Sequence, residues 1–326
     1  MTSSNIVTAK QSRSPFPSMM ALHQKRLRIW LRQLRVHQYV KNLLVFVPVI
    51  TAHEFNADAL TKSFLAAAAF SLCASAVYIL NDWWDLQADR AHPTKQFRPL
   101  AAGKIKVRDA LAAIPVLLTA SAWIALSISG LFAIIIAAYF VMTTAYTFLI
   151  KRKLIADVVL LAMLYTIRVI GGAVAISVPI SEWLLYFSIF VFASLALVKR
   201  TIELFDYADL GKDPYPSRGY YASDVGTVTA LAAAASMNAV TVFALYLSSS
   251  SAAGLYAHPK FLYLLCPIMI FWLFRLIALA QRKIIHDDPI VFAIKDRVSW
   301  MTCLVTAVIL LLASVKWTCD YAICIS

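Results

Sequence analysis

The stretch FLAAAAFSLCASAVYILNDWWDLQADR, residues 64–90, begins as an apolar run and ends with regularly spaced acids. Together with the few residues before it, the apolar part approaches the ~20 residues that a helix needs to cross ~30 Å of hydrocarbon. The polar residues follow with no glycine or proline between. The stretch therefore predicts a transmembrane helix that carries acidic groups out of one face of a membrane.

The composition of the whole chain agrees with a membrane protein. Of its 326 residues, 61% are hydrophobic and 14% are charged, whereas a soluble domain has about 45–50% and about 25%. With 8 glycines and 12 prolines, the chain is not a collagen-like or low-complexity polymer. The net charge of +13 is compatible with nucleic acid, an anionic membrane surface or a phosphorylated ligand. The fold class that remains is an all-α polytopic membrane protein.

Nine apolar segments are candidates for membrane spans. Helices are expected, because backbone groups in lipid must find their hydrogen-bond partners within the segment. Eight segments are clear, and the weakest is the one around LLVFVPVITA. We expect a bundle of nine transmembrane helices in a single domain over residues 21–326, after a disordered leader over residues 1–20. The expected spans are roughly 37–53, 62–80, 109–129, 131–150, 155–176, 182–198, 225–247, 262–280 and 301–319.

The basic residues predict the orientation of the spans. With nine spans, 25 of the 30 Lys and Arg residues lie on one side of the membrane and three on the other. Because cytoplasmic loops carry the excess of basic residues, we expect the N-terminus and the loops 81–108 and 199–224 to be cytoplasmic. This rule explains most of the net charge without nucleic acid as a partner. The basic, amphipathic segment 25–35 is expected to lie on the anionic inner leaflet.

The loop after the span at 62–80 carries acids first and bases second. Following Asn81, the residues Asp82, Asp85 and Asp89 share one face if the helix continues. Such carboxylates repel one another unless a cation lies between them, and Mg²⁺ suits oxygen ligands together with substrate phosphates. The alternative is a solvated charged loop. The bases that follow favour a Mg²⁺–diphosphate site; they are Arg90, His92, Lys95 and Arg98.

A second long loop starts at VKRTIELFDYADLGKD, residues 198–213. Lys199 and Glu203 are four residues apart, which is typical of an ordinary helix-end ion pair. In the alternative interpretation, Lys199 and Arg200 form a second cationic wall that faces the acids. The segment 218–220 fits a flexible lid or an inert turn.

Arg168 lies in the middle of the span at 155–176. An ionised residue at this depth is costly, so we expect it to face the bundle interior and a polar partner or ligand. A structural pair with Asp157, in the same span, is the alternative. Gly171 and Gly172 favour close helix packing over a catalytic role.

The loop NDWWDLQADRAHPTKQFRPLAAGK, residues 81–104, resembles the UbiA superfamily of intramembrane prenyltransferases, whose members carry NDxxDxxxD after the second span. The resemblance implies a nine-helix catalytic domain that uses Mg²⁺, held by Asp82 and Asp85, to activate a diphosphate over a central cavity. Ordinary members carry a second acidic motif, DxxxD, after the sixth span. Here that place reads KRTIE, residues 199–203, which suits a site that also receives a lipid phosphate.

This departure is similar to one branch of the family, the decaprenyl-phosphate phosphoribosyltransferases. The segments VHQYVKNLLVF (36–46), LYTIRVIGGAVA (164–175) and FAIKDRV (292–298) resemble that branch too, and the likeness covers roughly residues 35–310. It implies transfer of the 5-phosphoribosyl group of 5-phosphoribosyl 1-diphosphate to a polyprenyl (decaprenyl) phosphate. The product would lead to a lipid-linked arabinose donor for cell-envelope glycans or, in a rhizobial relative, for nodulation factors. The implied location is the bacterial inner membrane.

The resemblance also implies roles for individual residues. Catalytic roles fall to Asp82, Asp85 and Asp89. The substrate-binding residues implied are Lys41, Tyr78, Asn81, Lys95, Arg98, Lys151, Arg168, Lys199, Arg200 and Glu203. The partners expected are the two substrates and membrane lipids, with the oligomeric state left open. One alternative is an aromatic polyprenyltransferase that uses a prenyl diphosphate, which predicts two acidic clusters. Another is a secondary transporter, against which the sequence shows no inverted repeat.

Overall fold

The computed structural model describes residues 19–91, 94–209, 219–249, 256–286 and 288–314. Within these ranges every regular element is a helix, as predicted. The long helices are α3 (Ala57–Trp84), α5 (Val107–Ile128), α6 (Gly130–Ala145), α7 (Ala156–Ala175), α8 (Glu182–Asp209), α9 (Val225–Leu247), α11 (Leu265–Gln281) and α13 (Arg297–Ser314). The others are α1 (Met19–Gln33), η1 (Val36–Phe46), α2 (Val47–Thr51), α4 (Leu86–Ala91), η2 (Lys95–Phe97), η3 (Tyr146–Ile150), η4 (Ala222–Asp224), η5 (Pro259–Leu264) and α12 (Pro289–Lys295).

Eight helical stretches in the described ranges are long and apolar enough to cross a membrane. They fall on the eight clear spans of the sequence, with η3 extending α6 and η5 preceding α11. The helix α8 continues well past the expected end at residue 198, so KRTIE stays helical. Of the expected leader, only residues 19 and 20 are described, and they begin α1. Residues 315–319 of the last expected span lie outside the described part.

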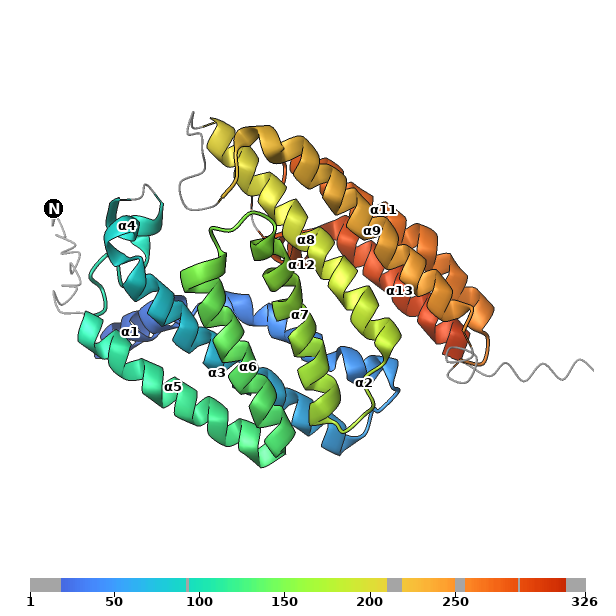
Figure 1. Cartoon of the computed structure of the whole chain (residues 1–326). Helices are drawn as coiled ribbons and strands as arrows, with labels where there is room; N and C mark the ends of the chain where they lie inside the picture. The colour runs from blue at the N-terminus through green and yellow to red at the C-terminus, as the bar shows by residue number, and fades with distance from the viewer. Residues whose placement is uncertain (1–18, 92–93, 210–218, 250–255, 287, 315–326) are drawn as a thin grey trace, which may run out of the picture.

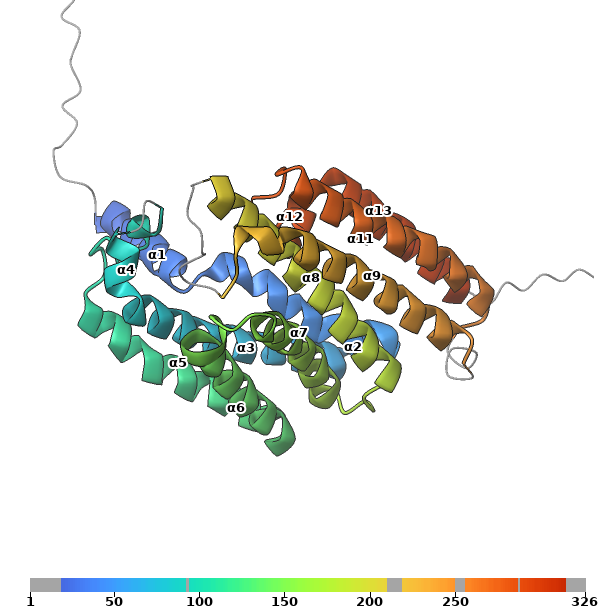
Figure 2. The same ribbon diagram turned by 45° about the horizontal axis from the view of Figure 1, so that its top comes forward.

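The helices form two groups that meet at α7 and α8 (Figure 1). One group contains α3, α5, α6 and α7, and the other contains α8, α9, α11 and α13. The blue segment η1–α2 crosses the molecule against α3 and α7, as the second view also shows (Figure 2). In both views α1 and the last turn of α13 lie at opposite ends of the bundle. Polar loops that are far apart in sequence meet at the end where α4 lies.

The segment expected as the ninth span is helical but is not a regular α-helix. Residues Val36–Phe46 form a 3₁₀ helix, and Val47–Thr51 form a short α-helix with Pro48 in its first turn. Because a 3₁₀ helix rises about 2.0 Å per residue and an α-helix about 1.5 Å, the two extend about 30 Å together. Five residues of the segment are buried, namely Lys41, Asn42, Val45, Pro48 and Val49. The segment is therefore long enough to cross a bilayer, while the count of nine spans stays a prediction.

The two glycines of α7 allow the close packing that the sequence suggested. A Cβ on Gly172 would overlap the backbone carbonyl of Val45 on η1, and one on Gly171 would lie 2.7 Å from the ring of Phe70 on α3. Both neighbouring elements therefore approach the α7 backbone directly. Arg168 lies one turn earlier on the same helix, so this packing brings its side chain next to η1.

Candidate active site

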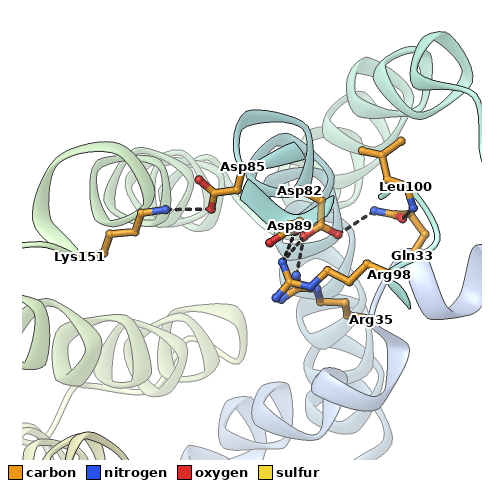
Figure 3. Close-up of polar contacts among 8 residues, drawn as sticks. All are labelled: Gln33, Arg35, Asp82, Asp85, Asp89, Arg98, Leu100 and Lys151. Carbon is orange, nitrogen blue, oxygen red and sulfur yellow. Dashed lines mark hydrogen bonds and ion pairs between the residues drawn. The ribbon is translucent and has the colours of Figure 1, made fainter. Parts of the chain in front are cut away.

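The acidic loop forms a cluster of polar side chains from four parts of the chain (Figure 3). We call it the acid cluster; it consists of Gln33, Arg35, Asp82, Asp85, Asp89, Arg98 and Lys151. The condition for one shared helical face is not met, because α3 ends at Trp84 and Asp85 caps it. Asp89 lies on the separate helix α4. As a result, Asp85 points toward Lys151, while Asp82 and Asp89 point toward the two arginines.

Asp82 is the centre of the acid cluster. Its side chain is 3% exposed, and its Oδ1 accepts hydrogen bonds from Arg35 Nη2 at 2.5 Å and Arg98 Nη1 at 3.2 Å. Its Oδ2 accepts from Gln33 Nε2 at 3.0 Å, and Gln33 Oε1 in turn accepts from the backbone N–H of Leu100 at 3.1 Å. The end of α1 is thereby tied to both sides of the acidic loop.

The acid cluster is the place where the sequence predicts a cation. Arg98 Nη1 also donates to Asp89 Oδ2 at 2.6 Å, so one guanidinium group bridges two carboxylates, where the sequence predicts a positive ion. Among the described residues no three His, Cys, Asp or Glu side chains converge as a metal site. Mg²⁺ needs only one or two protein carboxylates, because water and substrate phosphates complete its shell. Asp82 and Asp85 stay the predicted ligands; here Asp82 pairs with Arg35 and Arg98, and Asp85 pairs with Lys151.

Lys151, a predicted residue within the acid cluster, and Tyr78, a predicted residue beside it, make the next contacts. Lys151 Nζ donates to Asp85 Oδ2 at 3.0 Å, which links the loop after α6 to the end of α3. The ring of Tyr78 lies under the guanidinium group of Arg35, with the carbon of that group 4.8 Å from the ring centroid. Arg35 is thus held by a carboxylate and an aromatic face together.

The remaining residues expected in this loop have varied positions. Asn81 is half-buried at the end of α3, Lys95 is half-buried at the start of η2, and Arg90 is exposed on α4. His92 and Arg218 lie outside the described residues, so their roles stay predictions.

A second group of charges surrounds a pocket between η1, α7, α8 and α12. We call it the lysine pocket; its lining is Lys41, Leu161, Tyr165, Leu195, Ala196, Lys199, Asp288, Pro289 and Ile290, around a cavity of about 40 Å³. Asp288 Oδ2 accepts hydrogen bonds from Lys41 Nζ at 2.8 Å and Lys199 Nζ at 3.2 Å. Burial alone would raise the pKa of Asp288, but the charges of Lys199 and Lys41 outweigh it and hold that pKa well below its ordinary value.

Arg168 faces the bundle interior and polar partners, as expected. Its Nε donates to Asn42 Oδ1 at 2.9 Å, its Nη2 donates to the Tyr139 hydroxyl at 2.7 Å, and its Nη1 donates to the carbonyl of Leu164. No described carboxylate forms an ion pair with it, so the alternative pair with Asp157 is wrong. Neutral groups hold Arg168, which keeps its positive charge uncompensated among the described residues.

Arg200 lies in a closed cluster instead of the lysine pocket. Its side chain is fully buried and donates to Asp157 Oδ2 at 2.5 Å and to Glu203 Oε2. Tyr220 lies under its guanidinium group and donates from its hydroxyl to Asp157 Oδ1 at 2.7 Å. The same hydroxyl accepts from the backbone N–H of Ile155 at 3.0 Å. Tyr220 is therefore part of the packed interior, and the substrate role of Arg200 and Glu203 stays a prediction.

Sequence reasoning missed several members of these sites, among them Arg35 of the acid cluster. Asp288 follows another acid in HDDP, and Gln33 lies in a basic segment that looked like a membrane-surface helix. Tyr165 lies within a long apolar span. The available signal was weak in each case, although an acid immediately before a proline is typical of a helix N-cap.

Comparisons with known proteins agree with this architecture. A profile of the UbiA prenyltransferase family matches residues 43–294. The chain is 38% identical over 275 residues to the uncharacterised protein y4nM of Sinorhizobium fredii, which is 83% of this chain and 53% of that protein. It is 30% identical over 262 residues to the nodulation protein NoeC of Azorhizobium caulinodans, which is 80% of this chain and 85% of that protein.

A third relative carries an enzymatic name. The decaprenyl-phosphate phosphoribosyltransferase of Mycolicibacterium smegmatis is 36% identical over 179 residues, 53% of this chain and 56% of that protein. The chain thus spans about half the length of this relative and of y4nM. Among solved structures, a UbiA homologue from Archaeoglobus fulgidus bound to DMAPP and Mg²⁺ matches with a TM-score of 0.65 at 14% identity, over 87% of this chain and 99% of that chain. At this identity the match shows the fold alone.

Proposed function

Because this chain belongs to the UbiA prenyltransferase family, we propose that it transfers the 5-phosphoribosyl group of 5-phosphoribosyl 1-diphosphate to a polyprenyl phosphate and releases diphosphate. The observation that carries the proposal is the lysine pocket. Lys199, in the segment where the ordinary family motif has acids, meets Lys41 there and lines a pocket that borders apolar side chains. A site with one acidic and one basic half suits two phosphorylated substrates.

The proposed division of labour follows from the charges. The acid cluster takes the diphosphate, and the lysine pocket with Arg168 neutralises phosphate monoesters. Arg35 directly precedes η1 and Lys41 lies on it, six residues later and about 12 Å away at 2.0 Å per residue, so one segment reaches both halves. Apolar walls formed by Leu161 and Leu195 suit the isoprenoid chain.

The chemistry requires charge stabilisation more than proton transfer. Mg²⁺, when bound, supplies positive charge that stabilises the diphosphate as it leaves. Among the described residues Arg98 uses only Nη1, for Asp82 and Asp89, so Nε and Nη2 are the donors proposed for the diphosphate oxygens. The lipid phosphate is already an anionic nucleophile and attacks ribose C1 as the bond from C1 to the diphosphate breaks. A strong general base is not needed.

The names of two relatives support this assignment. One is named as a decaprenyl-phosphate phosphoribosyltransferase, and the other is named as a nodulation protein. We propose decaprenyl phosphate or a similar lipid as the acceptor. The phosphoribosyl lipid would then be a precursor of an arabinose donor that serves nodulation factors or envelope glycans.

The test is a transfer assay with membranes that contain the full chain. Radiolabelled 5-phosphoribosyl 1-diphosphate and decaprenyl phosphate should give a labelled lipid in the organic phase and an equal amount of diphosphate. Membranes that lack the chain are the control. Consumption of a prenyl diphosphate with an aromatic acceptor, and no labelled lipid, would show an aromatic polyprenyltransferase instead. Counterflow of a labelled phosphorylated compound without turnover would show a transporter.

A further inference from the structure

The lysine pocket already contains an anion that belongs to the protein. One oxygen of Asp288 accepts from both Lys41 and Lys199, and its side chain is 8% exposed. The two lysines come from η1 and α8, which are far apart in sequence, while Asp288 directly precedes α12. The acid therefore compensates two cations that would otherwise repel each other in a buried place.

The two lysines of the pocket keep hydrogen-bond donors for a second anion besides Asp288. Each ammonium group has three N–H donors, and Asp288 accepts one from each. The side chain of Lys199 is 34% exposed, and the lysines border the open volume of the pocket. An anion that enters the pocket meets both ammonium groups and has to compete with the carboxylate for them.

We propose that the lysine pocket binds a phosphate monoester and that Asp288 is its displaceable internal counter-anion, which keeps phosphate affinity low. The proposal rests on the proposed function for the identity of the ligand only. A phosphate monoester carries more charge than one carboxylate and can accept from both lysines at once. The apolar walls at Leu161, Leu195 and Ile290 suit the hydrocarbon chain of a lipid phosphate. A ribose 5-phosphate carries the same phosphate group without that chain.

The local geometry offers a clean substitution. The second oxygen of Asp288 accepts from the backbone N–H of Ile290 at 3.1 Å and caps α12. An asparagine caps a helix about as well, so Asp288→Asn removes the charge and keeps the cap. A matched control lies at the other end of the same helix, where Asp296 pairs with Arg275 at 2.6 Å outside the pocket lining.

The experiment measures binding by calorimetry with the purified full chain in detergent. Wild type, Asp288→Asn and Asp296→Asn are each titrated with inorganic phosphate, ribose 5-phosphate and a polyprenyl phosphate. Asp288→Asn should bind at least one phosphate monoester about 10-fold or more tightly than wild type, because the competing charge is gone. Asp296→Asn should bind like wild type. A gain for the lipid alone identifies the lipid phosphate as the ligand, and a gain for ribose 5-phosphate alone identifies the sugar phosphate.

Equal or weaker binding of all three probes by Asp288→Asn would overturn the proposal, since a merely structural acid can only weaken the site when it is changed. If that variant does not fold, Asp288→Ser, which also keeps a capping oxygen, is held to the same criterion. The readout is binding, so it separates the two proposals. If Asp288→Asn binds a phosphate monoester more tightly but the wild-type protein shows no phosphoribosyl transfer, the anion site is supported and the proposed reaction is rejected.

Discussion

The buried pair of Arg200 and Asp157 allows a decisive test of what Arg200 does. Both side chains are fully buried, and Arg200 Nη2 lies 2.5 Å from Asp157 Oδ2. Removing one partner of such a pair leaves an uncompensated charge and costs about 3–5 kcal/mol of unfolding free energy. We therefore expect Arg200→Met and Asp157→Asn each to destabilise the protein by about that amount. The double variant should lose much less than the sum, since both fully buried charges are removed and only the partly exposed Glu203 loses its partner.

The assay is unfolding in mixed micelles, with SDS as the denaturant and tryptophan fluorescence as the signal. The control is Arg275→Met, which breaks the pair with Asp296; those side chains are 21% and 12% exposed, so the loss should be smaller. The KM of the folded fraction of Arg200→Met should equal that of wild type for both substrates. Wild-type stability together with a KM raised about 10-fold or more would refute this reasoning and show Arg200 to be a substrate ligand, as the sequence suggests.

Three other predictions follow from the same contacts. Gly172→Ala should destabilise the protein by about 1–3 kcal/mol or more because its Cβ overlaps a carbonyl of η1, while Gly226→Ala, whose Cβ meets nothing within 4 Å, should change SDS unfolding little. Asp82→Asn should lower turnover by about 100-fold or more and EDTA should abolish it; full turnover in EDTA would reject the metal. Hydrogen bonds from Arg275 hold the pKa of Asp296 at about 2, below its ordinary 3.8, so the pair stabilises the protein above about pH 4. That stabilisation should be lost as the pH falls toward 2 in wild type, but not in Asp296→Asn, as unfolding titrations can measure.

Hydropathy alone predicted most of the fold. Eight spans were found because apolar length is a direct consequence of the thickness of a bilayer. The segment 36–51 was the weakest because its 3₁₀ winding spreads few residues over a long distance, which a window count does not detect. The prediction that Arg168 faces inward was also correct, because the cost of a charge in lipid does not depend on its exact neighbours.

The pairing of charges was harder to predict. The sequence suggested Lys199 with Glu203 and Arg168 with Asp157, whereas the contacts described join Lys199 to Asp288 and Arg200 to both Asp157 and Glu203. Spacing along one helix predicts only local pairs. These contacts depend on how α7, α8 and the segment before α12 pack together. The sequence of one helix does not determine that packing.

The 3₁₀ winding of η1 also determines the parity of the topology. Over the 11 residues of η1, the extra rise relative to an α-helix is only about 5 Å. That difference separates a segment that reaches across the hydrocarbon from one that stops short. With an even number of crossings the start of α1 and the end of α13 would lie on the same side of the membrane, and with an odd number on opposite sides. The side of the membrane on which the segment before η1 lies therefore depends on a few ångströms of helical rise.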